Sequence, residues 1–192
     1  MMNPLYNNRT YYIHDAGVFD KMLRDIAYDG YNTQETKEFA NTRIVLTDAS
    51  AKAWGFGSQN VIDVEQLIKA INEQDANMIN DVYDSKYYLF LKDEMKKVKE
   101  QFKTDCVGTR RAVFGFPATH CFDSIQVMIR DGAVLITVNM RSCNAYKNLI
   151  CDIYLAYRLA CEATHDWVRG EKHLIANIGS LHLFKEDVAH VL

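Results

Sequence analysis

The sequence lacks the features that would place it at once in several common classes of protein. No apolar run approaches the ~20 residues of a membrane span. The formal net charge of -3 includes no basic stripe of the kind that binds nucleic acid. Residues 1–12 lack the charged and apolar regions of a signal peptide. We therefore expect a soluble, cytoplasmic protein that binds neither membrane nor nucleic acid.

A disulfide framework and a second domain are also unexpected. The five cysteines are an odd set without a regular spacing, which favours free thiols, and we expect no metal site. The chain has no repeat, linker or low-complexity tract. Its 192 residues suit one domain that is large enough for a real core, so we expect a single domain over 1–192.

Hydrophobic periodicity divides the chain into helices and strands. Asp15 can cap a helix that ends just before Gly30, and residues 39–47 have strand character. Asp63 is placed to cap a second helix. Four further segments are expected, namely two helical tracts, a strand and a short tail, over 76–83, 85–102, 173–178 and 185–192.

The most informative stretch begins with a predicted hairpin. Two runs rich in β-branched and long apolar residues, 124–130 and 133–140, flank Asp131-Gly132, which favours a tight turn. Cys121 lies just before the first strand, and Arg141-Ser142 close the second. Because the strands are antiparallel, Arg141 should lie near Cys121. A nearby guanidinium group lowers the pKa of a thiol and so favours the nucleophilic thiolate.

A helix is expected after the hairpin, over 148–163. It is apolar nearly all round, which indicates a buried helix. Asp152 is its lone early carboxylate. A buried carboxylate must find a partner or a proton, so Asp152 is a candidate functional residue.

The spacing of these residues resembles the thymidylate synthase and pyrimidine hydroxymethylase superfamily. In that family a nucleophilic cysteine is followed by a glutamine, an Arg-Ser pair, an Asn or Asp that reads the base, and a G-x-x-H-x-Y element. This chain has those positions without a gap, at Cys121, Gln126, Arg141-Ser142, Asp152 and residues 179–184, which include His182. The match covers about 110 to 184.

The resemblance implies an α/β (α+β) fold in which a mixed, mainly antiparallel sheet is flanked by helices and dimerises through a sheet face. It implies that Cys121 attacks C6 of the pyrimidine ring of a nucleoside monophosphate. The one-carbon unit would come from 5,10-methylenetetrahydrofolate. Arg141 and Ser142 would bind the phosphate, helped by Arg110 and Arg111 of the neighbouring subunit.

The resemblance also assigns roles to residues farther from the cysteine. Gln126 and His182 would bind the substrate, His182 through a sugar hydroxyl group. Asn144 occupies the position that touches the pterin of the folate. Glu65 would organise water and proton transfer at the base, although Gln66 fits the spacing about as well.

Asp152 points to cytosine as the base. Family members that act on uracil usually carry Asn at this position, and members that act on cytosine carry Asp. A carboxyl group can accept from the N4 amino group and share a proton with ring N3. The favoured function is therefore C5 hydroxymethylation of a cytidine monophosphate, dCMP in the first instance.

Departures from the family pattern leave two other functions open. His120 and Phe122 flank the cysteine where the family has Pro and His, and Phe184 replaces a tyrosine. Together with Asn144 and the end of the sequence soon after His182, Phe184 favours an inactive nucleotide-binding subunit. The other alternative is a thymidylate synthase or a uracil-directed hydroxymethylase, against which Asp152 argues.

Each candidate residue also has an ordinary structural interpretation. A cysteine such as Cys121 is often a small buried hydrophobe. Asp152 would interact favourably with the start of a helix without any catalytic role. Arg141 could simply end a strand, His182 could be a structural histidine, and Glu65 could be an exposed helix residue.

Overall fold

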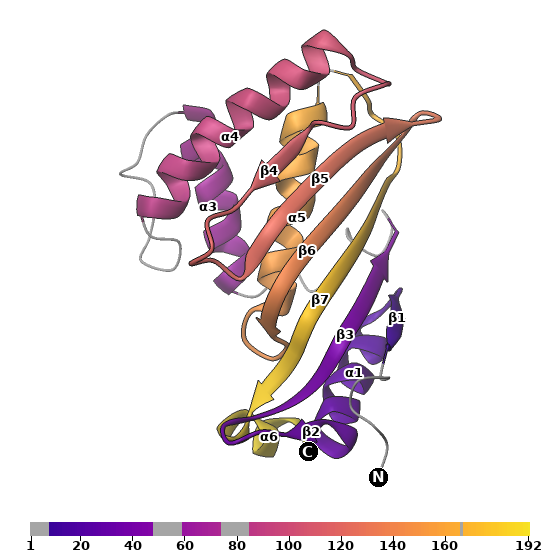
Figure 1. Cartoon of the computed structure of the whole chain (residues 1–192), viewed down its shortest axis with the longest axis vertical. Coiled ribbons are helices and arrows are strands. Elements are labelled where there is room, and N and C mark those ends of the chain that lie inside the picture. The colour runs from indigo at the N-terminus through magenta and orange to yellow at the C-terminus, as the bar shows by residue number, and fades with distance from the viewer. Residues whose placement is uncertain (1–7, 48–58, 74–84, 166) are drawn as a thin grey trace.

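The computed structural model describes residues 8–47, 59–73, 85–165 and 167–192 (Figure 1). The strands in these ranges are β1 (Thr10–Ile13), β2 (Tyr31–Asn32), β3 (Thr36–Leu46), β4 (Val113–Gly115), β5 (Phe122–Arg130), β6 (Ala133–Asn144) and β7 (Lys172–Phe184). The helices are α1 (Ala16–Asp29), α3 (Gln59–Glu73), α4 (Ser85–Thr104), α5 (Leu149–Thr164) and α6 (Lys185–Val191).

The strands form one mixed sheet in the order β1-β3-β7-β6-β5-β4, with β2 paired to the N-terminal part of β3. β1 runs parallel to β3 and β6 runs parallel to β7, whereas the other pairs are antiparallel. The predicted fold class, a mainly antiparallel sheet flanked by helices, is confirmed.

The described helices cover one face of the sheet and leave the other face open. In Figure 1, α5 lies behind β5 and β6, and α1 lies behind β3 and β1. Because helices cover only one face, buried and half-buried side chains alternate along β6. Val134, Ile136 and Val138 are buried beneath the helices, while Leu135 and Thr137 on the other face are half-buried. Within the described ranges, no helix is long and apolar enough to cross a membrane.

Local sequence signals account for the start of α1 and for the hairpin turn. The Asp15 carboxylate accepts a hydrogen bond from the backbone N–H of Val18 (3.0 Å), which confirms it as the helix cap. Asp131 and Gly132 both have positive φ, 51° and 79°. This is the backbone geometry of the two-residue turn predicted between the hairpin strands.

Several expected boundaries are wrong. α3 begins at Gln59, so Asp63 lies inside the helix and does not cap it. The expected tail over 185–192 forms α6, whose first turn carries Glu186 and Asp187, and carboxylates are favoured at that end of a helix. β7 extends well beyond 173–178 at its C-terminal end. The helical tract expected over 76–83 lies outside the described residues.

A row of irregularities crosses four neighbouring strands. In each strand, two buried side chains are three positions apart instead of two, and the register of β5 against β6 shifts at this level. One extra residue per strand therefore turns toward the open face, as in a β-bulge. The buried pairs are Phe39 and Thr42, Ile178 and Leu181, Met140 and Cys143, and Phe122 and Ile125. We call this feature the bulge row; its outward residues are 40–41, 179–180, 141–142 and 123–124.

The backbone geometry of the bulge row depends on Asn41 and Gly179. Asn41 of β3 has φ 52°, a value that asparagine tolerates better than most residues. A Cβ atom on Gly179 would lie 2.7 Å from the carbonyl oxygen of Arg141 in β6. Glycine therefore permits the close approach of β7 to β6 at this point.

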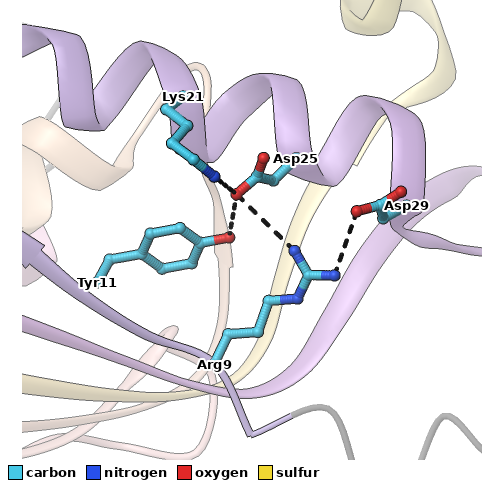
Figure 2. A network of polar contacts seen from close by, with 5 residues as sticks. All are labelled: Arg9, Tyr11, Lys21, Asp25 and Asp29. Atoms are coloured by element: carbon cyan, nitrogen blue, oxygen red, sulfur yellow. Dashed lines mark hydrogen bonds and ion pairs between the residues drawn. The ribbon is translucent and has the colours of Figure 1, made fainter.

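A network of charged and hydroxyl groups joins β1 to α1 (Figure 2). The carboxylate of Asp25 accepts from Tyr11 Oη (3.1 Å) and Lys21 Nζ (2.6 Å), and it lies 3.8 Å from Arg9 Nη1. Arg9 also donates to Asp29 (3.3 Å). Burial, together with the Asp25 carboxylate, raises the pKa of Tyr11 to about 12 despite the opposing effect of Arg9, so the hydroxyl group remains a hydrogen-bond donor.

We expect Asp25→Ala to lower the free energy of unfolding by about 1 to 2 kcal/mol, because it leaves the buried Tyr11 hydroxyl group without this acceptor. Asp29→Ala is the matched control, since Asp29 is exposed and accepts only from Arg9 among the described residues. Its effect should stay within about 0.5 kcal/mol. Urea unfolding of both variants measures the difference. Equal losses would show that the contacts of Asp25 do not stabilise the fold.

Candidate functional site

Cys121 and Arg141 lie side by side on adjacent segments. Cys121 is exposed and immediately precedes β5, and its carbonyl oxygen accepts from the backbone N–H of Arg141 (2.9 Å). The Arg141 guanidinium group donates to the carbonyl oxygen of His120 and lies 3.4 Å from the Asp123 carboxylate. The expected proximity is confirmed. The expectation that Arg141-Ser142 close the strand is wrong, because β6 continues to Asn144.

Polar residues on the outward side of the bulge row lie next to this pair. Ser142 pairs in register with Ser180, whose hydroxyl group donates to the Glu38 carboxylate (2.7 Å). His182 lies opposite Glu38, with its ring edge-on to Phe184 at a centroid distance of 5.3 Å. Sequence reasoning missed Ser180 and Glu38. Finding them required the register of β3 against β7, and the sequence of neither strand alone reveals it.

Asp152 points from α5 toward Cys143 of β6. Its Oδ2 atom lies 3.5 Å from the Cys143 thiol sulfur. Although the residue is partly accessible, its carboxyl group is desolvated, and this raises its pKa to about 7 against the opposing effect of the thiol hydrogen bond. Asp152 therefore has both a partner and a pKa that lets it hold a proton near neutral pH.

Cys143 was not a predicted site residue. Its side chain is 1% exposed, and burial, followed by the nearby Asp152, raises the pKa of its thiol well above the ordinary value. Cys121 and Cys151 contribute to the same shift, so Cys121 belongs to the surroundings of the Asp152–Cys143 pair. All five cysteines have free thiols, as expected. The only sequence signal for Cys143 was a thiol between two candidate residues, Ser142 and Asn144.

Glu65 is engaged in a contact between helices. It forms a two-point ion pair with Arg158 of α5 (2.6 and 3.1 Å) and accepts from the Tyr154 hydroxyl group. Burial raises the pKa of Glu65, but these hydrogen bonds outweigh it and the net shift is downward. Tyr154 and Arg158 lie about 200° and 240° around α5 from Asp152, at about 100° per residue. The structure thus gives Glu65 the role of fixing α3 against α5.

Asn144 holds the turn that precedes α5. Its Oδ1 atom accepts from the backbone N–H groups of Tyr146 and Lys147 (3.0 Å each), and its Nδ2 atom lies 3.5 Å from Asp187 of α6. The residue is 5% exposed. Both ends of the amide are used inside the protein, which leaves little of it for an external ligand.

Gln126 lies farther along β5, and Arg110 and Arg111 lie beside it, just before β4. The Gln126 amide donates to the carbonyl oxygen of Arg110 (2.9 Å) and so ties the Arg110-Arg111 segment to the sheet. Both arginines are exposed and line a shallow cavity of about 350 Å³. At about 3.3 Å per residue, Gln126 is roughly 16 Å along the strand from Cys121. The two arginines therefore lie away from the Cys121 of their own chain.

The structure thus places Cys121, Arg141, Ser142 and Asp152 at the same end of β5 and β6, with His182 on the next strand. Arg141 and Ser142 face the open side of the sheet, whereas Asp152 lies against Cys143 on the side covered by α5. It separates Glu65, Arg110 and Arg111 from this group. No protein-family model matches the chain, and a search of curated proteins finds no match either.

Proposed function

We propose that this chain modifies C5 of a pyrimidine nucleoside monophosphate, with dCMP as the substrate and a hydroxymethyl group as the product. The observation that carries the proposal is an exposed thiol, Cys121, beside Arg141, at the end of the sheet where the desolvated carboxyl group of Asp152 contacts Cys143. A thiol, a phosphate-binding cation and a carboxyl group that can be neutral are the groups that this reaction requires. The likeness in spacing to thymidylate synthases supports the same assignment.

In the proposed mechanism, the Cys121 thiolate adds to C6 of the base. A carbon–sulfur bond forms, and the electrons of the C5–C6 double bond move into the ring, where the neutral carboxyl group of Asp152 donates a hydrogen bond to N3. C5 thereby becomes a carbon nucleophile. Covalent addition of this kind divides one difficult substitution into easier steps. A hydrogen bond at N3 stabilises the charge that develops in the ring.

The phosphate of the substrate would be bound by Arg141 and Ser142. Arg141 is exposed and its guanidinium group contacts one carboxylate, Asp123, and one carbonyl oxygen. It can turn toward a phosphate at the cost of a surface ion pair, which is worth at most about 1 kcal/mol. His182 lies on β7, the strand next to β6. There it would bind a hydroxyl group of the sugar that carries the phosphate.

The resemblance assigns the one-carbon unit to 5,10-methylenetetrahydrofolate, but the residue expected to contact the pterin does not fit that role. Asn144 is buried and its amide is engaged at both ends. We retain the folate as the proposed one-carbon donor, with none of the described residues assigned to it. The same observation favours one alternative, a subunit that binds a pyrimidine nucleotide without completing the transfer.

Release of tritium from C5-labelled dCMP and dUMP, with and without 5,10-methylenetetrahydrofolate, tests these functions. Reversible addition of Cys121 exchanges the C5 hydrogen with water, so release from dCMP is expected even without the folate. Release that is faster from dUMP would favour the uracil-directed enzyme. Binding of either nucleotide without any release would identify the inactive subunit.

We also propose a homodimer that forms through the open face of the sheet and shares its sites. The large apolar side chains of β6 are not the reason, because Val134, Ile136 and Val138 face the helices. The support is instead the absence of a covering helix on the open face within the described ranges (Figure 1). A second reason is the position of Arg110 and Arg111, away from their own Cys121 and exposed to a neighbour.

Mixing Arg110→Ala subunits with Cys121→Ser subunits should restore partial tritium release, because hybrid dimers contain one site with both native residues. The control mixture combines Cys121→Ser with Ser142→Ala, whose defects lie in the same site of one chain, and it should restore much less. A chain that remains monomeric at micromolar concentration in sedimentation experiments would refute the shared site.

A further inference from the structure

The contact between Cys143 and Asp152 gives the two oxygens of the carboxyl group different roles. Cys143 Sγ lies 3.5 Å from Oδ2 of Asp152, and its other acceptor is the carbonyl oxygen of Asn144 (3.6 Å). The thiol is almost completely buried and its pKa is raised well above the ordinary value, so it keeps its proton. A thiol has one proton and is both a weak donor and a weak acceptor. Here the thiol donates, and Oδ2 is the nearer of its two acceptors. Oδ2 is therefore the oxygen that accepts.

A neutral carboxyl group has one donor and one acceptor oxygen, and it can exchange them by moving its proton. With the donor facing N3 and the acceptor facing the N4 amino group, it matches cytosine. With the order reversed, it matches the N3–H group and O4 atom of uracil. A neutral aspartate alone could therefore pair with either base.

We propose that Cys143 is a positioning residue that favours cytosine over uracil, because its thiol holds Oδ2 of Asp152 as the acceptor and so keeps the carboxyl proton on Oδ1. This inference rests on the proposed function, since it concerns how the same site reads the base. If the proton moved to Oδ2, the thiol would have to turn its own proton away to the more distant carbonyl oxygen of Asn144. Pairing with uracil would then cost the Cys143 hydrogen bond.

Among the described groups around Asp152 and Cys143, the thiol of Cys143 is the one that distinguishes the two oxygens of the carboxyl group. Burial and the Cys143 hydrogen bond act on the Asp152 carboxyl group. Cys121, before β5, and Cys151, on α5, act on the Cys143 thiol. Neither of these two residues is among the groups that act on the Asp152 carboxyl group. The order of donor and acceptor is thus set by hydrogen bonding to Cys143.

The test compares Cys143→Ala, which removes the donor, with Cys143→Ser, whose hydroxyl group can both donate and accept. Cys151→Ala is the control, because it removes the same sulfur atom from a buried site on α5, and the only hydrogen bond to the Asp152 side chain among the described contacts comes from Cys143. Two quantities are measured on the full chain. They are the pKa of Asp152, from the ¹³C shift of its labelled carboxyl carbon, and the dissociation constants of dCMP and dUMP.

Cys143→Ala should raise the pKa of Asp152, because it removes a hydrogen bond that favours the ionised form. It should also reduce the preference for dCMP over dUMP by about tenfold. Cys143→Ser should fall between this variant and the wild type, and Cys151→Ala should match the wild type in both quantities. A Cys143→Ala protein with an unchanged pKa and an unchanged preference would overturn the inference.

The failure of the proposed function would look different. In that case neither nucleotide binds to the wild type, while the titration of Asp152 still responds to Cys143→Ala. A pKa that responds together with a base preference that does not would show that the thiol contacts the carboxyl group but does not direct base reading, and it would also overturn the inference.

Discussion

Cys121→Ser is expected to reduce the release of tritium from C5 of labelled dCMP by a factor on the order of a thousand or more, as for the loss of other catalytic nucleophiles. A serine hydroxyl group has almost no ionised form at neutral pH, so the addition to C6 fails. Binding of dCMP should survive, because the backbone contact between Cys121 and Arg141 does not involve the side chain. Tritium release and calorimetric binding measure the two effects separately.

Two controls make the loss specific to this thiol. Cys106 and Cys161 are free, half-buried cysteines outside the site, and their replacement by serine should leave release within about twofold of the wild type. Undiminished release in the Cys121→Ser protein would remove the covalent mechanism altogether. Lost binding together with lost release would instead indicate damage to the phosphate site.

Asp152→Asn is expected to change the preferred base. The amide presents a donor to the N4 amino group of cytosine, which leaves mispaired polar groups at a cost of about 1 to 3 kcal/mol each in a desolvated site. The ratio kcat/KM for dCMP should fall at least about tenfold and that for dUMP should rise. Both nucleotides must be measured on both proteins, because a general loss could come from a disturbed α5. An Asn protein that keeps the original preference would exclude Asp152 from base reading.

The same substitution should change how stability depends on pH. The pKa of Asp152 is raised from 3.8 to about 7 in the folded chain. Between these values the folded protein holds a proton that the unfolded chain has released, so a rise in pH favours unfolding. The wild type should lose up to about 4 kcal/mol relative to Asp152→Asn as the pH rises through this window, with no further change above it. Urea unfolding of both proteins at pH 4, 5.5 and 8 measures the difference.

The elements that could be predicted from the sequence are those whose cause is local. Asp15 caps α1 because its carboxylate reaches a backbone N–H group three residues away. Asp131-Gly132 forms the turn because glycine and aspartate tolerate positive φ. Once the turn was known, antiparallel pairing placed Arg141 beside Cys121. The fold class was expected from the resemblance in spacing, and not from these local steps.

The features that could not be predicted depend on contacts between distant segments. The ion pair of Glu65 with Arg158 appears only when α3 packs on α5, and Glu65 then has a structural partner. Asn144 caps its own turn, but its contact with Asp187 requires α6, which no pattern had indicated. Cys143 became relevant only when α5 brought Asp152 against it.

The bulge row has a consequence for how this chain can change in length. Because the extra residues of β3, β7 and β6 lie level with one another, deletion of one residue from β6 ahead of Arg141 would turn Arg141 and Cys143 to the wrong faces and break the match with β7. Such a deletion would survive only with compensating deletions in the neighbouring strands. In divergent copies of this gene, gains and losses of residues should therefore fall in the connections between elements. The interval from Arg141 to Cys143, which lies within β6, should then stay constant while the surrounding sequence drifts.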